Sequence, residues 1–64
     1  MAMNITNAAI KYLAGFDSPD AIIAIAERGT SEEDDSRLED AYGDLWPAVA
    51  LAVERICQGL YPSP

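Results

Sequence analysis

The side chains that usually carry out catalysis are scarce in this sequence. It has no histidine, one lysine, Lys11, and one cysteine, Cys57. General acid–base and covalent catalysis mostly use histidine, cysteine, lysine or paired carboxylates held in a cleft. Helical phase places Cys57 beside Ala50 and Val53, and a thiol there without a neighbouring imidazole is typical of a core residue. Carboxylates and tyrosines from two chains could still form a site, but short helices leave little room for a cleft. We therefore predict no catalytic residue and no enzymatic activity.

Metal, cofactor and disulfide sites are not predicted either. A common zinc site needs several cysteines or histidines, and a disulfide framework needs more than one cysteine. A calcium loop needs alternating oxygen ligands, a glycine at its sharp turn and a distal glutamate. The acidic run over 32–36 has the order Glu-Glu-Asp-Asp-Ser and lacks that pattern.

Carboxylates are concentrated in the segment 30–46, which has seven acids and one base, Arg37. Acids in the first turn of a helix complement the positive end of its dipole, and Glu33 with Arg37 is a favourable i,i+4 pair. This explanation covers the acids of the first turn. It does not cover the three acids further along the segment, which are Glu39, Asp40 and Asp44.

Helical phase arranges these acids in two neighbouring strips, one with Glu33, Asp40 and Asp44 and one with Glu32 and Glu39. A helix rises about 18 Å over this segment, so its carboxylates are spaced about 2.6 Å apart along the axis. Duplex DNA has one phosphate charge per ~1.7 Å. Mimicry of a nucleic acid is therefore physically possible, while a solvated acidic face is the commoner outcome.

The segment 48–53 is apolar on every side of a helix. Such a helix is buried all round or contacts two different surfaces. Leu51 is expected to point outward, flanked by Pro47 and Ala48 and bordered by three charged residues, Asp44, Glu54 and Arg55. An apolar patch with a charged rim is a candidate contact site. The adjacent Trp46 is expected to lie either in the core or in that contact.

Three helices are predicted to position these residues, over about 4–15, 18–28 and 31–60. Together they predict an all-α fold in which two short helices pack on one long C-terminal helix. The chain forms one domain over 1–61, and we expect the tail over 62–64 to be disordered.

Capping residues define the ends of the two short helices. Asn4 and Ser18 are expected to be N-caps, and Pro19 suits the first helical position because its missing N–H needs no partner there. Gly15 is predicted to end the first helix in a left-handed conformation, and Gly29 to end the second.

The long helix is predicted from its start signal and its apolar period. Thr30 and Glu33 are expected to form a capping box. Apolar residues then recur at spacings of three and four, which indicates one seam facing the core or a second copy of the chain. The seam consists of Leu38, Tyr42, Leu45, Val49, Ala52, Val53, Ile56 and Leu60.

Pro47 lies inside this predicted helix, on its outer face. A proline there costs about 3 kcal/mol and bends the helix with the proline side convex. Because the seam keeps its phase across Pro47, we predict a kink. The alternative is that the helix breaks at Leu45–Trp46 and that Pro47 begins a new one.

Size and charge set the expected assembly and location. Ordering 64 residues costs roughly 100 kcal/mol, which a core of this size barely offsets, so a homodimer is expected. The net charge of −7 would repel a phosphate backbone, so direct nucleic-acid binding is not expected. The N-terminal residues do not resemble a signal peptide, and the longest concentrated apolar run, 45–53, is too short to cross a membrane. We therefore expect a cytoplasmic protein that does not bind membranes.

In size, charge and helicity the chain resembles the small inhibitors that phages and other mobile elements encode against host defence or regulatory proteins. This resemblance implies a class of function and transfers no residues. We predict a non-enzymatic protein-binding module, an inhibitor or regulatory adaptor that occludes a target with a basic patch. The predicted contact residues are Glu33, Glu39, Asp40, Asp44, Trp46, Pro47 and Leu51. A DNA mimic and a subunit or antitoxin-like chain that binds through its core face are the alternatives.

Overall fold

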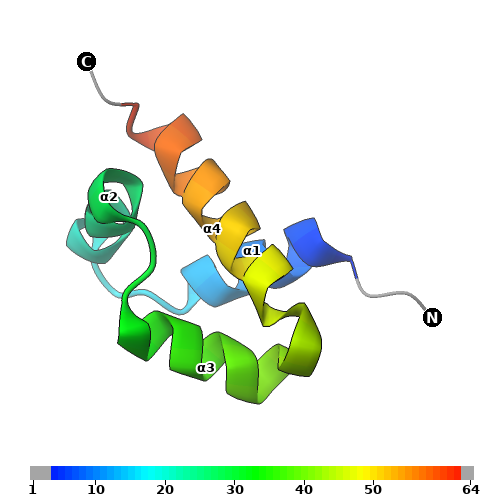
Figure 1. Cartoon of the computed structure of the whole chain (residues 1–64). Helices are drawn as coiled ribbons and strands as arrows, with labels where there is room; N and C mark the ends of the chain where they lie inside the picture. Colours follow the sequence, from blue (N-terminus) through cyan, green and yellow to red (C-terminus); the bar gives the residue numbers. More distant parts are fainter. Residues whose placement is uncertain (1–3, 63–64) are drawn as a thin grey trace.

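All regular structure in the described part of the chain, residues 4–62 of the computed structural model, is helical (Figure 1). The elements are α1 (Ile5–Ala14), α2 (Pro19–Arg28), α3 (Glu32–Tyr42), a short 3₁₀ turn η1 (Gly43–Leu45) and α4 (Trp46–Leu60). The predicted all-α class is confirmed. None of the helices in this part of the chain is long and apolar enough to cross a membrane.

The first two helices begin as their sequence signals indicate. The side chain of Asn4 accepts a hydrogen bond from the N–H of Asn7 at 3.0 Å, and Pro19 follows the N-cap Ser18. The end of α1 differs from the prediction, because Gly15 has φ −79° and is not left-handed. The last turn of α1 closes with an i→i−3 hydrogen bond, in which the N–H of Phe16 donates to the carbonyl of Leu13 at 3.1 Å.

The capping box of α3 lies one residue later than predicted. It pairs Ser31 with Asp34, where Thr30 and Glu33 were expected. Thr30 is used in other contacts: its hydroxyl donates to Asp35 at 2.7 Å, and its N–H donates to Glu54 of α4 at 3.2 Å. A tertiary contact therefore decides between two adjacent residues that both favour the N-cap position.

The single kinked helix predicted over 31–60 is wrong. The structure has a break, as in the alternative, but the break lies at Gly43, two residues before the Leu45–Trp46 position given for it. Helix α3 ends at Tyr42, and Gly43 adopts φ 60° and ψ −134° before η1 leads into α4. In a continuous helix the ring of Pro47 would clash with the carbonyl four residues earlier, which belongs to Gly43. With the chain broken at that glycine, Pro47 lies in the first turn of α4, where a missing N–H costs nothing.

Helix α4 is the centre of the packing, because α1, α2 and α3 each lie against it and contact one another only sparsely. Figure 1 shows α4 running through the molecule with the other three helices around it. The largest completely buried side chains are one from α3 and three from α4, namely Leu38, Val49, Val53 and Cys57.

The predicted seam is divided between the core and the surface. Leu38, Val49 and Val53 are buried, and Tyr42, Ala52 and Ile56 are half-buried against them. Leu45 and Leu60 are 49% and 61% exposed. Leu45 lies in η1 and Leu60 at the last turn of α4, so both lie beyond the region that the other helices cover. Residues 63 and 64 of the tail predicted to be disordered lie outside the described residues.

The break at Gly43 generates a stability prediction. Gly43→Ala should lower the free energy of unfolding by about 1–2 kcal/mol, because alanine is strained at φ 60° and ψ −134°. A Cβ at this position would meet no atom within 4 Å, so the effect isolates backbone strain.

Gly59→Ala is the matched control, since Gly59 is helical and also has open space around it. It should raise the free energy of unfolding by about 0.5–1 kcal/mol. Urea unfolding followed by circular dichroism measures both changes, and a Gly43→Ala variant as stable as the wild type would contradict the account of the break.

Candidate functional site

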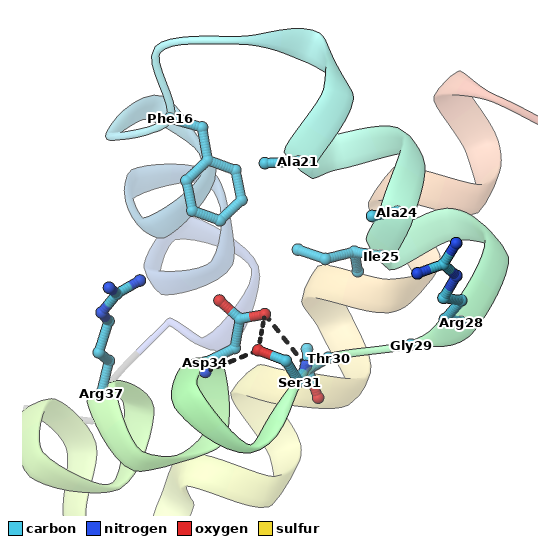
Figure 2. Close-up of a pocket in the computed structure, with 10 residues that line it drawn as sticks. All are labelled: Phe16, Ala21, Ala24, Ile25, Arg28, Gly29, Thr30, Ser31, Asp34 and Arg37. Carbon is cyan, nitrogen blue, oxygen red and sulfur yellow. Dashed lines mark hydrogen bonds between the residues drawn. The ribbon is translucent and has the colours of Figure 1, made fainter.

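A cleft of about 540 Å³ opens between α2 and α3 (Figure 2). We call it the α2–α3 cleft. Its lining comes from the chain segment after α1, from α2, from the loop after α2 and from α3. The residues are Phe16, Ala21, Ala24, Ile25, Arg28, Gly29, Thr30, Ser31, Asp34 and Arg37.

The cleft exists because α2 and α3 separate at their connecting loop while both remain on α4. Gly29 makes the turn with φ 81° and ψ −176°, a conformation that favours glycine. A Cβ there would also lie 3.0 Å from the carboxylate of Glu54. That carboxylate accepts the N–H of Thr30 and so fixes the loop to α4. Helical phase predicts Glu54 at the edge of the apolar patch around Leu51. In the structure Glu54 is half-buried, and its carboxylate contacts the loop instead.

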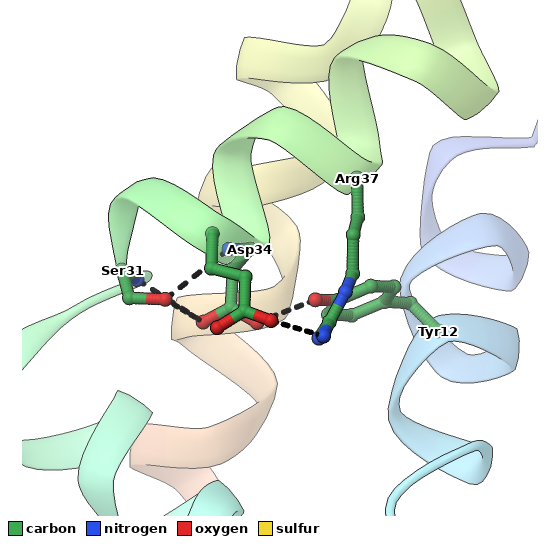
Figure 3. A network of polar contacts seen from close by, with 5 residues as sticks. Tyr12, Ser31, Asp34 and Arg37 are labelled. Atoms are coloured by element: carbon green, nitrogen blue, oxygen red, sulfur yellow. Dashed lines mark hydrogen bonds and ion pairs between the residues drawn. The ribbon is translucent and has the colours of Figure 1, made fainter.

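One wall of the cleft is a polar network around Asp34, which is only 9% exposed (Figure 3). One carboxylate oxygen accepts a hydrogen bond from the hydroxyl of Tyr12 in α1. The other accepts the N–H of Ser31 at 3.1 Å and its hydroxyl at 2.9 Å. The network therefore joins α1 to the start of α3, two helices with few other mutual contacts.

Burial and hydrogen bonding act in opposite directions on Asp34. Desolvation raises the pKa of its carboxyl, but the hydrogen bonds from Tyr12 and Ser31 outweigh it and hold the pKa below its ordinary value. Desolvation and the bond to Asp34 raise the pKa of Tyr12 to about 12. At neutral pH Asp34 is thus ionised and Tyr12 is protonated. Both oxygens of Asp34 are already engaged, so the pair is suited to holding helices together and poorly suited to accepting a substrate proton.

The predicted i,i+4 pair between Glu33 and Arg37 is confirmed. Both side chains are well exposed, so the pair contributes little to stability. The ion pair instead positions the guanidinium of Arg37, which lies at one end of the cleft, near Tyr12 (Figure 3).

A smaller groove of about 390 Å³ lies between α1 and α4, and we call it the Leu51 groove. Its apolar residues are Ile5, Ala48, Leu51, Ala52 and Ile56, with Thr6 and Arg55 beside them. Leu51 is 48% exposed, so a large apolar side chain lies open at the surface.

The structure groups the predicted contact residues only in part. Pro47 is exposed one turn before Leu51, while Trp46 is half-buried against the core. The acids Glu33, Glu39 and Asp40 are exposed on α3, and Asp44 is exposed in η1. Because α3 ends before Asp44, the acids do not form a strip along one continuous helix. The regular axial spacing of carboxylates that was compared with the phosphate spacing of DNA therefore does not occur.

Cys57 is a core residue. Its side chain is fully buried, and burial, followed by the charges of Asp34 and Glu54, raises the pKa of its thiol. Across residues 4–62, no three side chains of histidine, cysteine, aspartate or glutamate gather into a group that could hold a metal ion.

No family model, no curated protein and no solved structure matches this chain. What the α2–α3 cleft and the Leu51 groove can bind therefore has to be derived from their own residues.

The Tyr12–Asp34 bond generates a pH prediction. Tyr12→Phe should lower the free energy of unfolding at pH 7 by about 1–2 kcal/mol, because an ionised carboxylate loses a hydrogen bond while staying buried. The folded-state pKa of Asp34 is depressed, so its contribution is present above the unfolded pKa of about 3.9 and is lost as the pH falls below it. The difference between wild type and variant should therefore shrink in acid.

Tyr61→Phe is the matched control, since Tyr61 is exposed after α4. It should change stability little at any pH. Urea unfolding at a series of pH values measures the difference, and a Tyr12→Phe deficit that stays constant into strong acid would contradict the assigned role of Asp34.

Proposed function

We propose that this protein is a non-enzymatic, acidic protein-binding module, a small inhibitor or regulatory adaptor that blocks its target by occlusion. The observation that carries the proposal is the half-exposed Leu51 in an apolar groove between α1 and α4. The proposed location is the cytoplasm, where the single cysteine would stay reduced.

The Leu51 groove has the composition of a small binding hot spot. Apolar side chains from two helices meet there, and Thr6 and Arg55 provide polar edges. Protein interfaces typically have an apolar centre with a polar rim, and a few central residues supply most of the binding energy. Leu51 is the proposed central anchor. Pro47, exposed one turn earlier, extends the apolar surface along α4.

The charge of the chain favours a target with a basic patch. The net charge is −7, and the outward acids Glu39, Asp40 and Asp44 lie on α3 and η1, the elements that precede α4. Complementary charges speed the encounter of two proteins and orient them, whereas desolvated apolar anchors slow their dissociation. The acids are therefore proposed to guide the target, and Leu51 to hold it.

The outer side of α4 also favours a second copy of the chain as an occupant of the same groove. Ala48, Leu51 and Arg55 of α4 and Asp44 of the preceding η1 recur along the sequence at spacings of four, three and four, a pattern symmetric about its midpoint. If two α4 helices pack antiparallel about a two-fold axis at that midpoint, Ala48 of one faces Leu51 of the other. Asp44, two residues before the start of α4, is proposed to lie near Arg55 of the other copy. Such self-complementarity is what a two-fold interface requires. We propose that the free chain pairs weakly in this way and that the target displaces the second copy.

The experiment uses four variants as baits. Proteins captured from a cell lysate by the wild-type chain are identified by quantitative mass spectrometry, and the binding kinetics of each candidate are then measured at several salt concentrations. Leu51→Asp should abolish specific capture or raise the dissociation rate at least tenfold. The double variant Asp40→Asn with Asp44→Asn should lower mainly the association rate and flatten its salt dependence.

Two control variants make the same kinds of substitution at positions outside the proposed contact surface. Ile10→Asp introduces the same charge at a side chain that is 51% exposed and is not part of the Leu51 groove. The double variant Asp17→Asn with Glu27→Gln removes two exposed acids that precede α3. If Ile10→Asp weakens binding as much as Leu51→Asp does, the groove is not the docking surface. A DNA mimic would instead show competition by DNA, a steep salt dependence and no need for Leu51.

A further inference from the structure

We propose that the α2–α3 cleft is a ligand site for a small amphipathic carboxylate, an apolar chain or ring ending in one carboxylate, which Arg28 anchors. This proposal is independent of the protein-binding function, because the cleft shares no lining residue with the Leu51 groove.

The interior of the cleft is apolar and has the size of a small-molecule site. Phe16 points into it from the segment after α1, and Ala21, Ala24 and Ile25 line the side formed by α2 (Figure 2). Ile25 is almost completely buried and forms part of the base. Small-molecule sites typically measure ~300–1,000 Å³ and combine an apolar lining with a few polar groups. The two alanines matter because larger side chains at these positions would fill the space.

Positive charge is concentrated at the cleft, although the chain as a whole is strongly acidic. Two of its four basic residues, Arg28 and Arg37, line the cleft at opposite ends (Figure 2). Among the nearby carboxylates, that of Asp34 also lines the cleft, that of Glu33 is paired with Arg37, and those of Asp35 and Glu54 accept hydrogen bonds from Thr30. The lining cation that has no ion-pair partner within residues 4–62 is Arg28, and its guanidinium favours an anionic group at that end of the cleft.

The two arginines are not equally available. Arg37 is already paired with Glu33. Within residues 4–62, the side chain of Arg28 forms no ion pair, so its guanidinium can bind a carboxylate in a bidentate way. Arg28 is therefore the anchor, and Arg37 contributes long-range attraction.

Asp34 determines how such a ligand would lie. It is ionised, and its two oxygens accept hydrogen bonds from Tyr12 and Ser31. A ligand carboxylate placed next to it would be repelled, so the carboxylate belongs at the Arg28 end. The apolar part then lies on Phe16 and Ile25, where no charge has to be desolvated.

Decanoate tests this proposal, with decanol and decyltrimethylammonium as its neutral and cationic counterparts. Each is titrated into the full chain below its micellar concentration, and backbone amide shifts are followed by NMR. Decanoate should bind saturably, with the largest shifts at Ala21, Ala24 and Thr30, and at least several-fold more tightly than either counterpart. Equal or tighter binding of decanol or of the ammonium compound would overturn the proposal. So would non-saturating shifts, or shifts centred on Leu51.

Two pairs of variants separate the anchor from the apolar cavity. Arg28→Ala should weaken decanoate binding roughly tenfold, whereas Arg55→Ala, which removes the same charge from the Leu51 groove, should leave it unchanged. Ala21→Leu should weaken binding by filling the cleft, whereas Ala41→Leu at an exposed position of α3 outside it should not. All four sites are exposed, so each variant should fold. Unchanged affinity in Arg28→Ala, or in Ala21→Leu, would rule out the assigned site.

Discussion

Helix α4 has more apolar surface than one neighbour can cover, and the arrangement of the whole chain follows from this constraint. Helices α1, α2 and α3 each pack on α4 and barely on one another. Val49, Val53 and Cys57 of α4 are completely buried by them, together with Leu38 of α3. A chain of this length buries a smaller fraction of its surface than a larger domain does. Three short helices therefore leave one side of α4 open, the side that carries Leu51.

Long-range polar contacts add to the apolar packing on α4. Tyr12 of α1 donates to Asp34 of α3, and the loop residue Thr30 donates to Glu54 of α4. Both carboxylates are at least half-buried, where a hydrogen bond lost from one side is costly. These contacts join α1 to α3 and the loop before α3 to α4, and Thr30 and Asp34 both line the α2–α3 cleft. The Leu51 groove thus lies on α4, and the α2–α3 cleft lies between two of the helices that cover it.

Much of the local structure could be predicted from short-range signals. Asn4 and Ser18 are N-caps, Pro19 begins α2 and Glu33 pairs with Arg37, because each signal acts within one helical turn. The helix break could not be predicted from the apolar period, since the seam keeps its phase from Leu38 to Ile56. It depends instead on the positive φ of Gly43 and on the ring of Pro47 four residues later.

The cleft could not be predicted for a different reason. Its wall and its loop depend on contacts between residues 22 and 24 positions apart, Tyr12 with Asp34 and Thr30 with Glu54. Within α3, the carboxylate of Asp34 is one of four acids in the first turn, and nothing local distinguishes it from its neighbours. The outward direction of Leu51, in contrast, follows from helical phase within α4 alone.

The central claim is that the open side of α4 is covered by another molecule, and that a second copy of the chain fits it. Sedimentation equilibrium of the wild type, of Asp44→Arg and of the charge swap Asp44→Arg with Arg55→Asp tests this most directly. The account predicts that the wild-type mass rises with concentration above the 6.9 kDa of one chain, that the single variant stays at that mass, and that the swap restores association. A folded wild-type chain that remains at 6.9 kDa at every concentration, or a swap that restores nothing, would contradict it.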